Sequence, residues 1–405
     1  MSVPRAEDTV LSVVIPAWNE EDGIAAIIRR VRETEPALAE VGVTELELIV
    51  VDDASSDRTA EIVEAEGGAR LVRHRINRGY GAALKTGFHA ARGDLLAFLD
   101  ADGTYPPECF PELCSEALAG ADLVVGSRRS GADSQMPFVR RVGNLLWSNL
   151  VTLLCNHRVI DPASGMRVFH REALDRLYPL PDGLNFTPVM STRAIHEGVR
   201  LSEIPIPYTE RVGRSKLSVV EDGVRFLRTI VWTALNYNPV RILGGVGVGM
   251  VALSALFGAV LVGMRISGVT TLGPWGVGAA FAAVVLAIAG VDSFALGVIF
   301  NYLVSLFHKR PVRQGLFGEP IFKVPLDRQF WWIGLLGVVA GLGFGAVSLA
   351  LGLDGWAIER LWLYLLAGSM LILVGTQLVV FWVIARVLEE LSQREALVEA
   401  DLTCE

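Results

Sequence analysis

The stretch AFLDADGTYPPE at residues 97–108 places two carboxylates, Asp100 and Asp102, directly after an apolar run that is typical of a buried strand. On both sides of it, short runs rich in Val, Ile and Leu alternate with amphipathic runs. This alternation predicts an α/β fold, a mostly parallel sheet with helices on its faces. Strands are expected at 9–17, 45–53, 69–74, 94–100 and 121–127.

Polar side chains gather where these expected strands end. They are Pro16 to Glu20 after the first strand, Asp52 and Asp53 after the second, Asp100 and Asp102 after the fourth, and Ser127 and Arg128 after the fifth. Ligands of such sheets bind outside the carboxyl ends of the strands. One ligand that touches all four groups would therefore lie along this edge.

The pair Asp100 and Asp102 suits a hard divalent cation. Mg²⁺ usually takes one or two protein carboxylates and completes its shell with water and phosphate oxygens, and Mn²⁺ accepts similar ligands. An acidic loop cap without a metal is the alternative interpretation of Asp-x-Asp alone. Its position at the tip of a buried strand, among other polar strand ends, favours the metal.

The stretch NRGYGAALKTG at residues 77–87 is a glycine turn that enters a helix. Backbone N–H groups at such a helix start suit a diphosphate, and Lys85 is placed to reach it. A solvated helix lysine is the alternative. The stretch is not a Walker A motif, and no G-x-G-x-x-G follows the first strand, so kinase-like and dehydrogenase activities are disfavoured. A separate helix is expected over 19–35, with Asn19 as its cap.

The 52% hydrophobic content of the 405-residue chain is too high for an ordinary soluble protein, and beyond Pro239 the sequence consists of long apolar runs broken by short polar loops. Four apolar runs, about 239–264, 276–306, 331–352 and 361–386, are long enough to cross a hydrocarbon core of about 30 Å. The loop between the second and third runs holds the most Lys and Arg, which predicts that it is cytoplasmic. We therefore expect a multi-pass protein of the cell's inner membrane, with both termini and the N-terminal domain in the cytoplasm.

The expected division of the chain is a cytosolic domain over 1–215, an interfacial amphipathic helix over 216–238, four transmembrane helices over 239–390 and a cytosolic tail over 391–405. A helix buried against the first domain is the alternative for 216–238. A net charge of −8 and the lack of a basic, aromatic stripe argue against a nucleic-acid partner. The four cysteines show no metal-ligand spacing.

Four motifs, VVIPAWNEEDGI, IVVDDASSDRT, NRGYGAALKTGF and LLAFLDADGTYPPE, together resemble the family 2 glycosyltransferases of GT-A (Rossmann-like) fold. Within that family, residues 9–235 are most similar to dolichol-phosphate mannose and glucose synthases and to bacterial polyprenyl-phosphate relatives. The resemblance implies a nucleotide site of Pro16, Trp18, Glu20, Asp53, Lys85 and Ala101. It also implies a metal site of Asp100, Asp102 and Thr104, with Thr104 standing where many members have glutamine.

The acceptor implied by this resemblance is a lipid phosphate, and arginines grip phosphate oxygens in pairs. The implied acceptor residues are Arg128, Arg140, Arg141, Asn144, Arg211, Arg214, Ser215 and Lys216. Asn144 stands one helical turn after Arg140, where some relatives have serine. Ordinary surface arginines are the alternative. Asp161, in a further matching segment, is expected either to bind donor hydroxyls or to cap a turn.

The expected activity is transfer of a hexose, with inversion, from a UDP- or GDP-sugar to a polyprenyl or dolichyl phosphate at the cytosolic membrane face. UDP-glucose and GDP-mannose are the favoured donors. Asp100, Asp102, Lys85 and Arg128 are the expected catalytic residues, and Mg²⁺ or Mn²⁺ the cofactor. A processive polysaccharide synthase and an inactive nucleotide-sugar-binding scaffold are the alternatives, and a homo-oligomer is left open.

Overall fold

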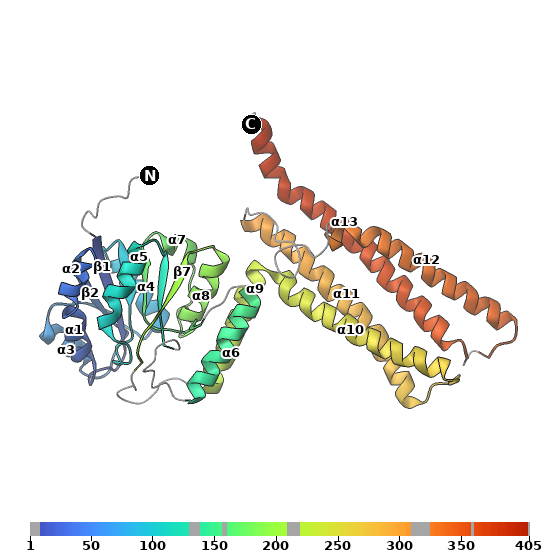
Figure 1. Cartoon of the computed structure of the whole chain (residues 1–405), viewed down its shortest axis with the longest axis horizontal. Helices are drawn as coiled ribbons and strands as arrows, with labels where there is room; N and C mark the ends of the chain where they lie inside the picture. Colours follow the sequence, from blue (N-terminus) through green and yellow to red (C-terminus); the bar gives the residue numbers. More distant parts are fainter. Residues whose placement is uncertain are drawn as a thin grey trace. The chain divides into compact units, whose positions relative to one another are not determined.

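The computed structural model describes residues 9–128, 138–155, 160–208, 219–308, 325–357 and 360–403. The chain forms two compact units, Met1–Thr233 and Ala234–Glu405. The first contains a sheet with helices on both faces and the second contains long helices (Figure 1).

A seven-stranded sheet in the order β3-β2-β1-β4-β6-β5-β7 forms the centre of the first unit. Its strands are β1 (Thr9–Ala17), β2 (Val43–Asp52), β3 (Arg70–Arg73), β4 (Leu95–Phe98), β5 (Leu123–Ser127), β6 (Arg167–His170) and β7 (Leu201–Pro205). Only β6 runs antiparallel to its neighbours among these described strands. The predicted α/β class is confirmed, and all five predicted strands are present.

Helices cover both faces of this sheet because successive strand residues point to opposite sides. Val13 and Ile15 of β1 join one core cluster, whereas Val14 joins the other. The first cluster includes side chains of α1 (Ile24–Arg32), α2 (Glu35–Glu40), α3 (Thr59–Glu66) and α5 (Phe110–Leu118), which follows the 3₁₀ turn η1 (Pro107–Cys109). The second includes α4 (Tyr80–Ala90), α7 (Ala173–Leu177) and α8 (Phe186–His196).

The first helix does not begin at Asn19 as predicted. Asn19 has a φ of 52°, and its side-chain oxygen accepts the N–H of Ser56 at 2.8 Å. Helix α1 begins at Ile24 instead. Asn19 therefore links the loop after β1 to the loop after β2 by a hydrogen bond, and it does not cap a helix.

Four phenylalanines pack against one another at the end of β4. The ring of Phe88 lies 6.0 Å from Phe98, 5.3 Å from Phe169 and 6.3 Å from Phe186. Each of these side chains is almost fully buried, and truncating such a ring to alanine typically costs about 3–5 kcal/mol. The polar residues that follow Phe98 therefore start from a rigid base.

Two longer helices, α6 (Phe138–Cys155) and α9 (Val219–Tyr237), lie side by side (Figure 1). Trp147 of α6 meets Phe226 of α9 edge-on, with ring centroids 6.3 Å apart. At the other side, Asn185 before α8 donates a hydrogen bond to Thr229 of α9 at 3.0 Å. Apolar side chains remain exposed on both helices: Leu145, Leu146, Val224, Leu227 and Trp232.

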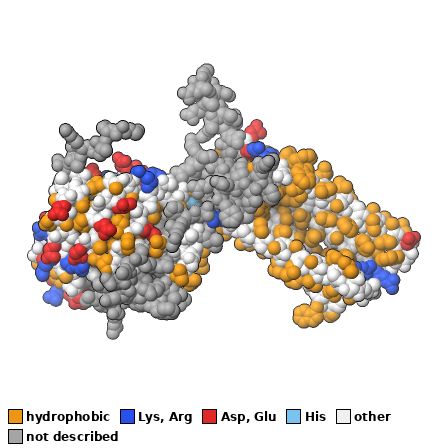
Figure 2. Space-filling view, in the orientation of Figure 1, with side chains coloured by type: hydrophobic (Ala, Val, Ile, Leu, Met, Phe, Trp, Pro, Cys, Tyr) orange, Lys and Arg blue, Asp and Glu red, His pale blue; other side chains and the backbone are white. Residues whose placement is uncertain are grey.

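The second unit contains four helices that are long and apolar enough to cross a membrane. They are α10 (Pro239–Ile266), α11 (Pro274–His308), α12 (Leu326–Leu353) and α13 (Trp362–Thr403). The first three predicted spans fall inside α10, α11 and α12, and the fourth begins one residue before α13; hydrophobic side chains cover much of their visible surface (Figure 2). Residues 391–403, expected as a tail, continue α13, since no glycine or proline interrupts the sequence there.

Glycines let these helices approach closely in pairs. A Cβ on Gly247 would come within 2.5 Å of the Gly290 carbonyl, and one on Gly334 within 2.5 Å of the Gly375 carbonyl. Such small residues at helix contacts are typical of membrane bundles. Arg386 of α13 pairs with Asp327 of α12 at 2.6 Å, and Tyr302 of α11 donates to the same carboxylate at 2.8 Å.

Candidate active site

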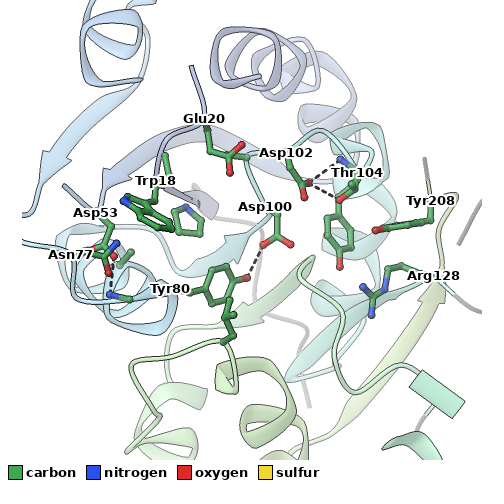
Figure 3. A pocket seen from close by; sticks show the side chains of 17 residues that line it. Trp18, Glu20, Asp53, Asn77, Tyr80, Asp100, Asp102, Thr104, Arg128 and Tyr208 are labelled. Carbon is green, nitrogen blue, oxygen red and sulfur yellow. Dashed lines mark hydrogen bonds between the residues drawn. The ribbon is translucent and has the colours of Figure 1, made fainter. Parts of the chain in front are cut away.

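A cleft of about 330 Å³ opens at the carboxyl ends of β1, β2, β4 and β5. Most of the predicted site residues of the first unit line it: Pro16, Trp18, Glu20, Asp53, Asp100, Ala101, Asp102, Thr104 and Arg128. Trp18, Asp53 and Asn77 lie at one end, Asp100 and Asp102 in the middle, and Arg128 with Tyr208 at the other end (Figure 3). The structure therefore brings residues from four strand ends into one cavity.

Asp53 holds the loop that begins the glycine turn. Its Oδ1 accepts the N–H of Arg78 at 2.8 Å, and its Oδ2 accepts the N–H of Gly79 at 2.8 Å. The His74 ring lies 2.6 Å from Oδ1 and 2.9 Å from the hydroxyl of Thr86. These bonds place Asn77, a residue not singled out from the sequence, in the cleft wall beside Asp53.

The start of α4 does not present its N–H groups to the cleft as predicted for a diphosphate. The N–H groups of Gly81 and Ala82 both donate to the carbonyl oxygen of Asp182, at 2.7 and 3.1 Å. Lys85 forms an ion pair with the Asp182 side chain and donates to the Leu180 carbonyl at 3.0 Å. Lys85 is therefore absent from the cleft lining, because the 180–184 segment satisfies both the helix start and the lysine.

The two central carboxylates each receive a hydroxyl hydrogen bond. Tyr80 donates to Oδ1 of Asp100 at 2.8 Å, and Thr104 donates through its Oγ1 to Oδ1 of Asp102 at 2.7 Å (Figure 3). The Thr104 N–H adds a second bond to Asp102 at 3.1 Å. Burial, reinforced by the charge of Asp100, raises the pKa of Tyr80 well above its usual value, so its hydroxyl stays a donor.

This pair fits the divalent ion that was expected from the sequence. Among the described residues, no group of three or more His, Cys, Asp or Glu gathers around a common point. Mg²⁺ does not require one, because it commonly combines one or two carboxylates with water and phosphate oxygens of the substrate. Thr104 was expected as a third ligand, and its bond to Asp102 gives it an orienting contact with that carboxylate.

Arg128 is clamped at the far end of the cleft. Its Nε and Nη2 donate to the two carboxylate oxygens of Asp161 at 2.8 and 2.7 Å. Its guanidinium carbon lies 5.8 Å from the Tyr105 ring centre and 5.6 Å from the Tyr208 ring centre. Burial acts to lower the pKa of Arg128, but the Asp161 carboxylate together with Tyr105 and Tyr208 outweighs it and holds that pKa well above its usual value. The arginine is a permanent cation with a fixed orientation.

The segment 160–165 is braced from several sides. Glu203 accepts the N–H groups of Ile160 and Asp161, both at 2.9 Å. Ser164 donates through Oγ to the Gly126 carbonyl at 2.5 Å. Asp161 is not among the cleft-lining residues; its carboxylate pairs with Arg128, and its carbonyl accepts the N–H of Ser164 at 3.4 Å in a turn.

Arg167 supports the same segment from below. It is fully buried and donates through Nη2 to the carbonyls of Pro162 at 2.8 Å and Thr187 at 3.1 Å. Burial lowers the pKa of Arg167 to about 10, a value at which the side chain is still charged at neutral pH. The segment is thereby joined to the first turn of α8.

The remaining predicted acceptor residues cannot be compared with this geometry. Arg140, Arg141 and Asn144 belong to α6, but their side chains lie outside the described part of the structure. The element Arg211, Arg214, Ser215 and Lys216 also lies outside the described residues. Tyr80, Tyr105 and Tyr208 were not singled out from the sequence, although Tyr80 and Tyr105 stand inside motifs that were.

The sequence family described as "Glycosyl transferase family 2" matches residues 12–178. An undecaprenyl-phosphate 4-deoxy-4-formamido-L-arabinose transferase of Klebsiella pneumoniae is 30% identical over 325 residues, which cover 78% of this chain and 94% of that protein. This chain belongs to glycosyltransferase family 2. The glycosyltransferase also resembles the namesake enzyme of Pseudomonas aeruginosa, at 31% identity over 78% of this chain and 91% of the relative. The resemblance inferred from the motifs is thereby confirmed.

A third relative of the glycosyltransferase is the low-salt glycan biosynthesis hexosyltransferase Agl6 of Haloferax volcanii, 37% identical over 56% of this chain. The match spans 54% of Agl6, about half of its length. Residues 239–399 match a family described as a domain of unknown function, DUF8752. Among solved structures, glucosyl-3-phosphoglycerate synthase from Mycobacterium tuberculosis with UDP aligns with a TM-score of 0.45 and 24% identity, over 58% of this chain and 83% of that one.

Proposed function

We propose that this glycosyltransferase moves a hexose from a nucleoside-diphosphate sugar to the phosphate of a polyprenyl phosphate, with inversion at the anomeric carbon. The observation that carries the proposal is the placement of the acidic pair and of Arg128 in one cleft. The relatives named as undecaprenyl-phosphate sugar transferases support the acceptor class. UDP-glucose and GDP-mannose remain the favoured donors.

The residues divide the work along the cleft. Trp18 and the Asp53 loop would hold the nucleotide, since both lie at one end of the cavity. Asp100 and Asp102 would face the diphosphate through Mg²⁺ or Mn²⁺, which when bound neutralises charge on the departing diphosphate. Arg128 would receive the acceptor phosphate at the opposite end, with the arginines of α6 and the 211–216 element.

No general base is required for this acceptor. A phosphate monoester has a second pKa near ~6, so the attacking oxygen is already mostly ionised at neutral pH. The protein then needs to align that oxygen behind the anomeric carbon and to stabilise the leaving group. A single in-line displacement, without a covalent glycosyl-enzyme, satisfies both requirements.

The exposed apolar side chains of α6 and α9 support access from a lipid surface. Leu146 is 62% exposed and Val224 63% exposed, and Arg225 and Arg228 are also exposed on α9. Such a pattern is typical of helices that lie in a membrane interface. With the loop charges between α11 and α12, it favours a catalytic unit on the cytoplasmic face.

The test uses the purified full-length chain in nanodiscs with a panel of UDP- and GDP-hexoses, Mn²⁺ or Mg²⁺ and a short polyprenyl phosphate. The proposal predicts one sugar per lipid, inverted anomeric configuration by NMR, and loss of transfer with EDTA. Long polymer would instead indicate a processive synthase. Nucleotide-sugar binding without turnover would indicate a scaffold.

A further inference from the structure

The Asp100 carboxylate is enclosed on both sides by residues with no other assigned role. On one side, the Tyr80 hydroxyl donates to Oδ1 at 2.8 Å. On the other, Gly165 approaches so closely that a Cβ built on it would lie 2.5 Å from Oδ2 and 2.9 Å from Oδ1. Since real Cβ atoms essentially never approach that closely, only glycine leaves the carboxylate its observed position.

Both flanking residues are themselves held in place. Tyr80 is the first residue of α4, whose start is fixed by the Asp182 carbonyl. The N–H of Gly165 donates to the Tyr105 hydroxyl at 2.7 Å, next to the bond between Ser164 and Gly126. The gap that receives the carboxylate is therefore defined by braced backbone on one side and a partly buried ring on the other.

We propose that Tyr80 and Gly165 act together to fix the rotamer of Asp100, which makes Tyr80 a positioning residue for the acidic pair. This inference rests on the proposed function. Thr104 orients Asp102 in the same way, so each acid has its own hydroxyl donor. A divalent ion held by this acidic pair would bind more tightly when the carboxylates are already arranged.

The test measures metal binding apart from turnover. Mn²⁺ is titrated by EPR against the full-length protein saturated with UDP or GDP, whichever the wild type binds. Tyr80→Phe keeps the ring and removes one hydrogen bond to a charged group, so the Mn²⁺ Kd is expected to rise about tenfold. The KM for Mn²⁺ should rise in parallel, with a smaller change in kcat and an unchanged melting temperature.

Gly165→Ala is the second variant, and its Mn²⁺ Kd is expected to rise further because the new Cβ displaces the carboxylate. Tyr178→Phe is the matched control for the tyrosine, since Tyr178 is 36% exposed and outside the cleft lining. Gly245→Ala in α10 is the control for the glycine, because nothing lies within 4 Å of its added Cβ. Both controls should bind Mn²⁺ like the wild type.

An unchanged or tighter Mn²⁺ Kd in Tyr80→Phe, with wild-type transfer, would overturn the positioning role and leave the proposed function standing. A wild-type protein that binds no Mn²⁺ with either nucleotide would overturn both. A raised Mn²⁺ Kd in Gly165→Ala alone would also overturn the positioning role of Tyr80. The effect would then be due only to the collision between the new Cβ and the Asp100 carboxylate.

Discussion

Asp161 binds Arg128 through three hydrogen bonds, two from the guanidinium and one from the Arg128 backbone N–H at 3.0 Å. The side chain of Asp161 is fully buried, and that of Arg128 is 14% exposed. Removing one partner of such a buried pair leaves the other charge without compensation. The pair therefore links the stability of the domain to the placement of its cleft cation.

Asp161→Asn is expected to lower the free energy of unfolding by about 3–5 kcal/mol. It should also raise the KM for polyprenyl phosphate more than the KM for the sugar nucleotide, since Arg128 loses its fixed orientation. Chemical denaturation and steady-state kinetics measure the two effects.

Asp122→Asn is its matched control. Asp122 accepts the Arg200 backbone N–H at 3.0 Å and its Nη2 at 2.8 Å, and lies 3.6 Å from Nη1 of Arg176, but the Arg200 side chain is 70% exposed and that of Arg176 42% exposed. Exposed pairs contribute little, so this variant should resemble the wild type in both measurements. Equal losses in the two variants would contradict the importance of burial.

Lys85→Met separates the sequence-based prediction from the structure. A lysine on the departing diphosphate would be worth a loss of roughly 100-fold or more in kcat. A lysine paired with Asp182, whose side chain is 64% exposed, should cost less than about tenfold. Single-turnover rates distinguish these two roles, and a 100-fold loss of rate would indicate that Lys85 contacts the diphosphate.

Asp102→Asn and Thr104→Val test how the second acid is held. Removing the charge of Asp102 is expected to lower kcat/KM by at least roughly 100-fold. Thr104→Val retains that charge and loses the 2.7 Å bond, so a loss of about tenfold is expected. If Thr104→Val were as damaging as Asp102→Asn, threonine would have a direct role rather than an orienting one.

Gly81→Ala tests the contact that closes the start of α4. Its Cβ would lie 2.2 Å from the Pro181 carbonyl and 2.9 Å from the Phe186 ring. Overpacking of this kind typically costs about 1–3 kcal/mol, and thermal unfolding should show it. Gly223→Ala, whose Cβ would make an ordinary 3.8 Å contact with Trp147, should leave the melting temperature unchanged.

The sheet and much of the cleft could be predicted because their signals are local. The run at 9–17 has the apolar content of a buried strand, and β1 has those bounds. Asp53, Asp100 and Asp102 follow strands directly, and strand ends of a parallel sheet share an edge. β6 and β7 are not among the strands expected from the alternating pattern, since they are short runs of four and five residues.

The contacts that the sequence could not indicate are those between residues far apart in the chain. From its own motif, Lys85 is expected to be a phosphate ligand. The carbonyl that accepts its hydrogen bond in the structure, that of Leu180, lies 95 residues further along the chain. Asp161 likewise shows no sign in its own neighbourhood of the arginine 33 residues before it. Tyr80 differs from both residues, because it lies in a motif that was recognised. The role of its hydroxyl could not be predicted, since the hydroxyl donates to Asp100, 20 residues further along the chain.

The hydrogen bond from Asn185 to Thr229 has a mechanical consequence. Asn185 adjoins Leu184, which lines the cleft, and Thr229 lies on the helix that leads into α10. A turn of α9 about its axis would pull directly on the cleft wall. If α9 rests on lipid as proposed, the width of the cavity and the lipid contact of this helix would be coupled, and we expect the turnover rate to vary with bilayer composition.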